Sequence, residues 1–374
     1  MIQRDFSQRL RELDIDHLRL SQGAHTQHEI EGWLANPNAI IGNPNALSAL
    51  LSPAAEKYIE PLAQLSSSLT RQRFGNTIGL YAPLYVSNLC ANDCDYCGFS
   101  MSNSIKRKIL SEKEIEVEAR VLRERGIESV LLVSGEHERK VGIDYFSDIL
   151  PALKSTFSYL AIEIQPLSEA DYAHLVDKGL DAVMVYQETY RASVYALHHI
   201  RGKKTNFNWR LDCPDRAARA GVEKIGLGVL LGLTDWRLDA LLLGYHLAYL
   251  EKRYWRSRFS LSMPRLRPCT GSGIDVQEMS DRAFVQMLCA FRLFSPNSEL
   301  SLSTRESATL RDHLLRLGVT HMSAQSSTEP GGYSSPNTQL DQFEISDERS
   351  VLEVATAIRH AGLQPIWKDW HSEW

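Results

Sequence analysis

The chain has 374 residues, of which 43% are hydrophobic and 23% are charged, and its formal net charge is −5 at pH 7. A negative balance argues against a nucleic-acid partner, and no run of about 18 apolar residues exists that could span a membrane. Because the first ten residues lack the apolar core of a secretory signal, we expect a cytoplasmic protein, in which six cysteines indicate metal ligands or free thiols rather than disulfides.

In chain order, a helical region precedes an alternating pattern of strands and helices. Residues 1–75 are predicted to be mostly helical, and they form an N-terminal extension. Apolar, β-rich runs then alternate with helical segments up to the C-terminus, near residues 78–87, 129–134, 159–165, 181–187, 223–231, 258–263, 299–304 and 319–324. Eight such repeats predict a parallel (βα)8 barrel of TIM type over residues 76–374, which ends in a C-terminal tail.

Two of the predicted helices have clear start signals. Ser111 and Glu114 form a capping-box pattern, and Gly126 is placed to end the helix that follows. A second helix is expected over residues 276–293, with its start near Asp275.

Three cysteines lie within eight residues, directly after the first predicted strand. Cys90, Cys94 and Cys97 have the spacing C-x3-C-x2-C, and Tyr96 precedes the third of them. Four thiolates would complete a structural zinc site or a simple electron-transfer cluster, so three thiolates leave one metal position open for chemistry. A zinc knuckle completed by a distant histidine and a chance grouping are the alternatives. The other thiols are widely spaced and are interpreted as core or loop residues: Cys213, Cys269 and Cys289.

Polar residues follow most of the predicted strands. In a barrel of this type the loops at the carboxyl ends of the strands build the active site. We therefore expect the following residues to face one common mouth together with the cysteines: Glu136, Gln165, Glu188, Arg265, Arg305 and Ser323.

The cysteine spacing resembles the cluster loop of the radical S-adenosylmethionine enzymes, in which three cysteines hold a [4Fe-4S] cluster and the fourth iron chelates S-adenosylmethionine. Longer strings resemble, nearly end to end, the tyrosine lyases of bacterial thiamine (thiazole) biosynthesis: residues 69–76, 87–94, 96–103, 183–190, 300–307 and 364–370. The resemblance implies reductive cleavage of S-adenosylmethionine to methionine and 5′-deoxyadenosine. Breakage of the Cα–Cβ bond of L-tyrosine would then give dehydroglycine and p-cresol.

The same resemblance implies a set of residues that bind S-adenosylmethionine. Glu136 holds the position of the Gly-Glu motif after the second strand, where it would pair with the ammonium group. Gln165 would reach the ribose or the carboxylate, and the glycine motif at Gly226 and Gly228 would lie beside the adenine. Tyr96 occupies the aromatic position before the third cysteine. A surface carboxylate is the alternative for Glu136, and close backbone packing is the alternative for the two glycines.

For the substrate, the resemblance implies a carboxylate anchor. Arg305 is expected to pair bidentately with the tyrosine carboxylate, with Ser323 and Tyr85 beside the substrate. The alternative for Arg305 is an ion pair with Glu306 or Glu188, which are also the candidate general bases. Two further arginines are candidate anion contacts: Arg265 and Arg267.

The implied partners are a thiazole synthase that receives dehydroglycine and an acidic electron donor, a flavodoxin that is reduced at the expense of NADPH. Residues 106–108, Arg71 and Arg73 are basic and flank the cysteine motif, so they are expected to form a landing rim for the donor; a solvated basic face is the alternative. Three rival functions are a tryptophan lyase, a zinc-binding scaffold and a tyrosine lyase of hydrogenase maturation. The last carries further cysteines in a C-terminal extension, whereas the last cysteine here is Cys289.

Overall fold

A computed structural model describes residues 5–271, 273–336 and 341–367, so the end of the predicted C-terminal tail lies outside the described residues. Eight parallel strands form the central sheet, and each coincides with one predicted apolar run: β1 (Thr77–Ser87), β3 (Ser129–Ser134), β4 (Tyr159–Glu163), β5 (Ala182–Met184), β7 (Lys224–Gly228), β8 (Arg258–Ser262), β9 (Glu299–Leu302) and β10 (His321–Ser323). The last strand pairs with the first, Leu80 lying opposite Met322. The sheet is therefore closed, and the predicted TIM-type barrel is confirmed.

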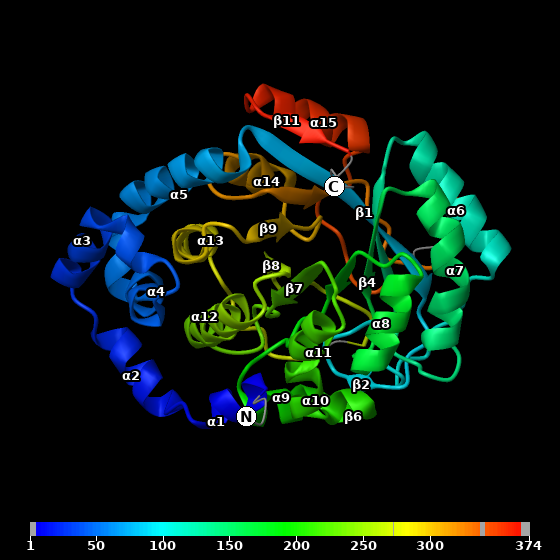
Figure 1. Ribbon diagram of the computed structural model, residues 1–374, viewed down its shortest axis with the longest axis horizontal. Coiled ribbons are helices and arrows are strands. Elements are labelled where there is room, and N and C mark those ends of the chain that lie inside the picture. Colours follow the sequence, from blue (N-terminus) through cyan, green and yellow to red (C-terminus); the bar gives the residue numbers. More distant parts are fainter. Residues whose placement is uncertain (1–4, 272, 337–340, 368–374) are drawn as a thin grey trace.

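Helices cover the outside of the barrel (Figure 1). The strands are connected through α6 (Glu112–Glu124), α7 (Ile143–Thr156), α8 (Glu169–Asp177), α11 (Cys213–Arg219), α12 (Trp236–Arg253), α13 (Asp281–Phe294) and α14 (Ala308–Leu314). The capping box of α6 is present as predicted at Ser111 and Glu114. The predicted start of α13 is wrong by five residues, because the Ser280 hydroxyl accepts a hydrogen bond from Ala283 N at 3.2 Å and caps the helix there.

The N-terminal region is helical, as predicted. It contains α1 (Phe6–Arg11), α2 (Ile15–Ala24), α3 (Gln27–Ala35), α4 (Pro44–Leu51) and α5 (Ile59–Phe74), with short 3-10 turns at Pro37–Ile40 and Pro53–Tyr58. These helices wrap around α12 and α13 (Figure 1). A Cβ at Gly244 of α12 would overlap the Leu47 side chain of α4, so the glycine allows these two helices to pack closely. Beyond the barrel, α15 (Val351–His360) leads to β11 (Gln364–Ile366), which pairs with the start of β1.

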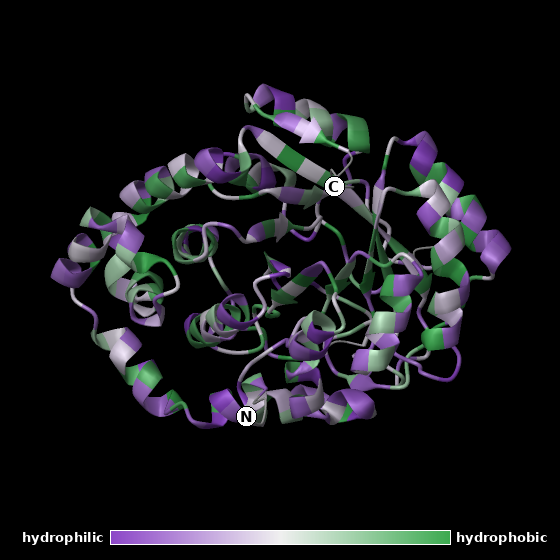
Figure 2. Cartoon of the chain, viewed as in Figure 1, coloured by the Kyte–Doolittle hydropathy of each residue, from purple (hydrophilic) through white to green (hydrophobic). Residues whose placement is uncertain are grey.

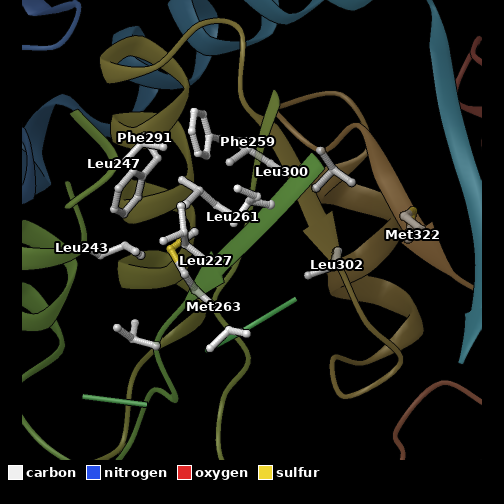
Figure 3. Packing of buried hydrophobic residues seen from close by; sticks show 14 of the residues in the cluster. Leu227, Leu243, Leu247, Phe259, Leu261, Met263, Phe291, Leu300, Leu302 and Met322 are labelled. Carbon is white, nitrogen blue, oxygen red and sulfur yellow. The ribbon is translucent and has the colours of Figure 1, made fainter. Parts of the chain in front are cut away.

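The hydrophobic core lies between the strands and the outer helices. Leu227, Phe259 and Leu261 of the strands pack toward Leu247 of α12 and Phe291 of α13 (Figure 3). All five side chains are buried, and burying a side chain of this size contributes roughly 1.5–3 kcal/mol. The outer helices carry hydrophilic as well as hydrophobic residues (Figure 2), and none of the helices in the described ranges has the length and apolarity needed to cross a bilayer.

Candidate active site

One cavity at the carboxyl ends of the strands collects most of the predicted site. Its lining includes eight of the eleven residues that the sequence assigned to catalysis, cofactor binding or metal ligation: Tyr85, Cys90, Cys94, Tyr96, Cys97, Glu136, Arg305 and Ser323. These residues come from the first, second, seventh and eighth barrel strands and the loops that follow them. The expectation of a shared mouth is confirmed for the three cysteines and for Glu136, Glu188, Arg305 and Ser323, whereas Gln165 and Arg265 do not line this cavity.

The cysteine loop is held by a small antiparallel ribbon. Cys94 lies in β2 (Asp93–Cys94), which pairs with β6 (His199–Arg201). Burial raises the pKa of Cys90 to about 11 and also raises the pKa of Cys94. Both thiols are therefore neutral unless a cation offsets the cost of a buried thiolate, which is what metal ligation supplies.

The chemistry of the donor set fits an iron–sulfur cluster, because thiolates are the usual ligands of such clusters and three of them line this one cavity. The described residues contain no group of three His, Cys, Asp or Glu side chains that could hold a single metal ion. Amide donors approach two of the sulfurs, Asn92 N to Cys90 Sγ at 3.4 Å and Gln342 Nε2 to Cys97 Sγ at 3.6 Å. Hydrogen bonds of this kind stabilise cluster thiolates and tune their potential.

Tyr96 is fixed by a histidine of the ribbon. Its hydroxyl lies 2.7 Å from His199 Nε2, and His199 Nδ1 lies 2.6 Å from the carbonyl oxygen of Tyr195 in α9 (Ala192–His198). Burial lowers the pKa of His199 to about 3, so the ring is neutral. A carbonyl can only accept, so Nδ1 carries the proton and Nε2 accepts from the Tyr96 hydroxyl.

Glu136 belongs to a partly buried group of charged residues, which we call the Glu136 cluster: Glu136, Glu188, Lys204 and Arg210. Arg210, in α10 (Phe207–Leu211), donates to Glu136 at 2.8 Å and lies 3.5 Å from Glu188, while Lys204 contacts Glu188 at 2.8 Å. Burial alone would raise the pKa of Glu188, but Lys204 and Arg210 outweigh burial and lower it. Glu188 is thus ionised and paired, which disfavours it as a general base.

Sequence reasoning missed both cations of this cluster. The signal that could have revealed them is the number of basic residues in the segment 201–210, which contains four Lys or Arg residues. Because this segment follows the predicted fourth strand, it could have been placed at the barrel mouth.

Arg305 is the unpaired cation of the cavity. In the part of the chain that the structure describes it makes no ion pair, and its guanidinium stacks on the Phe343 ring, 3.4 Å from the centroid. The predicted alternative partners are engaged elsewhere, since Glu306 accepts from Arg265 at 3.0 Å and Glu188 belongs to the Glu136 cluster. The alternative in which Arg305 is neutralised by either glutamate is therefore wrong.

The neighbours of Arg305 are held by hydrogen bonds within the cavity wall. The Ser323 hydroxyl accepts from Thr304 N at 3.2 Å, and the Tyr85 hydroxyl donates to Gln342 Oε1 at 2.7 Å. Arg265 forms ion pairs with Glu306 and, at 2.8 Å, with Asp281. Neither Arg265 nor Arg267 lines the cavity. A role for these two arginines as anion contacts is not supported.

Glu163 is a cavity residue that the sequence analysis did not identify. It ends β4, and burial, with a further contribution from Glu188, raises the pKa of Glu163 to about 7 although Arg305 opposes the shift. The signal was present, because Glu163 is the one charged residue in the apolar run 159–164. A carboxylate that titrates near neutrality in a cavity is a candidate functional group.

Replacing Glu163 with glutamine is expected to stabilise the fold at high pH. The raised pKa means that the wild-type carboxylate destabilises the folded state once it ionises, so stability is lost as pH rises from the unfolded value near 4.5 toward 7. Glu163→Gln, which is neutral throughout, should raise the free energy of unfolding by on the order of 2 kcal/mol at pH 8.5. The gain should shrink as pH falls below 7 in thermal unfolding scans, and a gain independent of pH would contradict the assignment.

Three predicted cofactor contacts do not line the cavity: Gln165, Gly226 and Gly228. Gln165 Nε2 donates to the carbonyl of Val141 at 2.9 Å. A Cβ at Gly226 would overlap the Met184 side chain, so packing inside the barrel already accounts for this glycine. Contact of these three residues with S-adenosylmethionine stays a prediction.

Gly228 gives a sharp test of that packing. A Cβ there would overlap the carbonyl oxygen of Ser262 on the neighbouring strand, so Gly228→Ala should lower the free energy of unfolding by roughly 2–3 kcal/mol. The matched control is Gly23→Ala in α2, where no atom lies within 4 Å of the added carbon, and a gain of about 0.5 kcal/mol is expected. Chemical denaturation measures both; equal effects would refute the packing argument.

The predicted basic rim is wrong in part. Arg71 and Arg73 end α5, just before the start of β1, so they lie at the opposite end of the barrel from the cysteine loop. The guanidinium of Arg107 is engaged in hydrogen bonds within the cysteine loop. It donates to the carbonyl oxygens of four residues: Asn88, Phe99, Ser100 and Asn103. Of the residues predicted to form the basic rim, Lys106 and Lys108 are the ones that stay beside the cysteine loop and are not engaged in it as Arg107 is.

Comparisons with known proteins agree with this geometry. Residues 84–243 match the family model "Radical SAM superfamily", and residues 262–364 match "Biotin and Thiamin Synthesis associated domain". The chain is 54% identical to 2-iminoacetate synthase of Escherichia coli (strain K12) over 98% of this chain and 97% of that protein. It is 52% identical to 2-iminoacetate synthase of Salmonella typhimurium (strain LT2), again over 98% and 97%.

Among solved structures, the chain resembles the FeFe-hydrogenase maturase HydG from Carboxydothermus hydrogenoformans. The TM-score is 0.86 at 31% identity, over 97% of this chain and 83% of that chain. Identity of this extent to the 2-iminoacetate synthases, together with the three-cysteine cavity, fixes the assignment. The chain belongs to the 2-iminoacetate synthase family of radical S-adenosylmethionine enzymes, which are lyases.

Proposed function

We propose that the protein cleaves the Cα–Cβ bond of L-tyrosine to dehydroglycine (2-iminoacetate) and p-cresol, with formation of 5′-deoxyadenosine and methionine, for thiamine thiazole biosynthesis. The observation that carries the proposal is the 54% identity to the Escherichia coli 2-iminoacetate synthase over nearly the whole chain. It is supported by one cavity that contains both the three cysteines and an unpaired arginine.

Cys90, Cys94 and Cys97 are the proposed ligands of a [4Fe-4S] cluster. Such a cluster, when bound with S-adenosylmethionine, supplies one-electron reductive cleavage of the sulfonium and thereby a hydrogen-abstracting radical. The protein orients the reactants. The Glu136 cluster presents both charges to the methionine end of S-adenosylmethionine, Glu136 to its ammonium group and Arg210 with Lys204 to its carboxylate.

Arg305 is the proposed anchor of the tyrosine carboxylate. Its guanidinium is held flat against Phe343 and is free for a bidentate pair. Glu163 lies in the same cavity and, once ionised, can accept hydrogen bonds from the substrate ammonium group or a ribose hydroxyl. Tyr85 and Ser323 would flank the substrate, and Tyr96 would lie beside the bound cofactor. The surrounding barrel would shield the reacting atoms from water.

The remaining partners belong to the same proposal. A flavodoxin-type donor, reduced at the expense of NADPH, would deliver the electron near Lys106 and Lys108 beside the cysteine loop. A thiazole synthase would take the dehydroglycine. A change in the substrate pocket can alter substrate choice, so the competing tryptophan lyase has to be tested directly.

The test is an anaerobic assay of the reconstituted, reduced protein with S-adenosylmethionine and either L-tyrosine or L-tryptophan, followed by mass spectrometry. Equal amounts of p-cresol and 5′-deoxyadenosine from tyrosine are expected. Tyrosine-independent formation of 5′-deoxyadenosine without p-cresol would refute the tyrosine assignment, and turnover of tryptophan in its place would select the competing lyase.

A further inference from the structure

The first described residues of the chain are bound to the helix that carries Arg210. Helix α1 lies beside α10 (Figure 1). The backbone N and the hydroxyl of Ser7 donate to the two oxygens of Asp212, at 2.7 Å each. Asp212 is the single residue between α10 and α11, two positions after Arg210. A shift of this junction would therefore move the Arg210 side chain.

A second contact connects the same segment to the loop that carries Glu188. The Phe6 ring, fully buried, stacks on His246 of α12 with centroids 4.0 Å apart and planes 8° apart. His246 Nδ1 lies 2.8 Å from the hydroxyl of Tyr190. Tyr190 N and the Thr189 hydroxyl both donate to Asp239 of α12, at 2.9 and 3.0 Å.

The backbone of that loop needs such support. Glu188, immediately before Thr189, has a φ of 69°, which is costly for a residue other than glycine and persists only where the surroundings hold it. Its carboxylate is nevertheless placed to meet Lys204 and Arg210. The two supports therefore converge, since one holds the helix of Arg210 and the other holds the loop of Glu188.

We propose that Phe6 and Ser7 are positioning residues for the Glu136 cluster and so set the affinity for S-adenosylmethionine, although they belong to the N-terminal extension. Ser7 acts through Asp212 on Arg210, and Phe6 acts through His246 and Tyr190 on Glu188. That the Glu136 cluster binds S-adenosylmethionine rests on the proposed function. That Phe6 and Ser7 support the cluster rests on the contacts described above. Charge clusters that recognise a ligand lose affinity when their geometry is loosened by a fraction of an ångström.

The experiment is a titration of the reconstituted, reduced full-length protein with S-adenosylmethionine, followed by the electron paramagnetic resonance spectrum of the cluster. Ser7→Ala is expected to raise the apparent Kd about tenfold, while iron content and kcat at saturating S-adenosylmethionine change less than about twofold. Ser7→Thr, which keeps the hydroxyl, should restore the wild-type Kd. The matched control is Ser21→Ala, whose hydroxyl bonds only within α2, and its Kd should not change.

Thermal unfolding of each variant separates positioning from stability. A Ser7→Ala protein with a lower melting temperature and an unchanged Kd would overturn the proposal. If Ser7→Ala does not fold, Phe6→Leu provides the second test, because it keeps apolar volume but removes the stack on His246; an unchanged Kd there would overturn the proposal as well. Failure of the wild-type spectrum to respond to S-adenosylmethionine would instead refute the proposed function.

Discussion

Cys94→Ala is expected to eliminate both products, p-cresol and 5′-deoxyadenosine, to below roughly a thousandth of the wild-type rate. Cys94 is buried in the ribbon between β2 and β6, and its replacement by alanine leaves the cluster with two of its three protein thiolates. Iron and sulfide content after anaerobic reconstitution should fall together with activity. Mass spectrometry and iron analysis of the same sample measure the two losses.

The matched control is Cys269→Ala. The Cys269 thiol also lies near the loop, where it donates to the carbonyl of Tyr96 at 3.2 Å, yet it is not a predicted ligand. Full iron loading and at least about half of the wild-type activity are expected, because the hydrogen bond that this thiol donates to Tyr96 is weak. Loss of the cluster in Cys269→Ala, or turnover in Cys94→Ala, would show that the ligand assignment is wrong.

Arg305→Met is the second large expected effect, a fall in kcat/KM for L-tyrosine of roughly a hundred- to a thousandfold. Removing one partner of a desolvated charge pair costs about 3–4 kcal/mol, and here the substrate carboxylate would be left unpaired in the cavity. Methionine keeps much of the contact with Phe343 but carries no charge. Binding of S-adenosylmethionine should persist, since its proposed contacts are with the Glu136 cluster and not with Arg305.

We therefore expect the two products to become uncoupled in this variant. At a high concentration of S-adenosylmethionine, 5′-deoxyadenosine should still form, but the amount of p-cresol should be smaller than the amount of 5′-deoxyadenosine. Arg267→Met provides a matched control, because this arginine follows the sixth barrel strand and does not line the cavity. Its kcat/KM should stay within about threefold of wild type. Equal losses in the two variants would remove the argument for Arg305 as the carboxylate anchor.

The barrel was predictable from the sequence because its strands are buried and contiguous. A buried parallel strand is a short apolar run, and all eight runs became strands, with errors only at their ends. The start of α13 was misplaced because residues 276–280 are compatible with a helix by composition, whereas the Ser280 cap decides the boundary. Capping contacts depend on one side chain and are invisible to an average over a window.

Active-site residues could be predicted from the sequence only where they belong to a short motif or lie at the end of a predicted strand. The cysteine motif is local, Arg305 follows β9 closely, and Ser323 is the last residue of β10. Lys204 and Arg210 reach the cavity because the segment after β5 returns over the barrel mouth and pairs with the cysteine loop, which is long-range information. Glu163 was overlooked although its position on a strand was predicted. The assignments of Gly226 and Gly228 came from the resemblance, and that of Gln165 from the resemblance and its position at the end of a predicted strand; contact of all three with S-adenosylmethionine stays a prediction.

The ribbon between β2 and β6 also has a consequence for biosynthesis. Tyr96 of the cysteine loop is bonded to His199, 103 positions further along the chain, so during translation this contact cannot form until that residue leaves the ribosome. At about 5–20 residues per second this delay is roughly 5–20 s, during which the ribbon that buries Cys94 is incomplete. We therefore expect iron insertion to follow, rather than accompany, synthesis of the first half of the chain, and oxidative damage to nascent chains to concentrate on these cysteines.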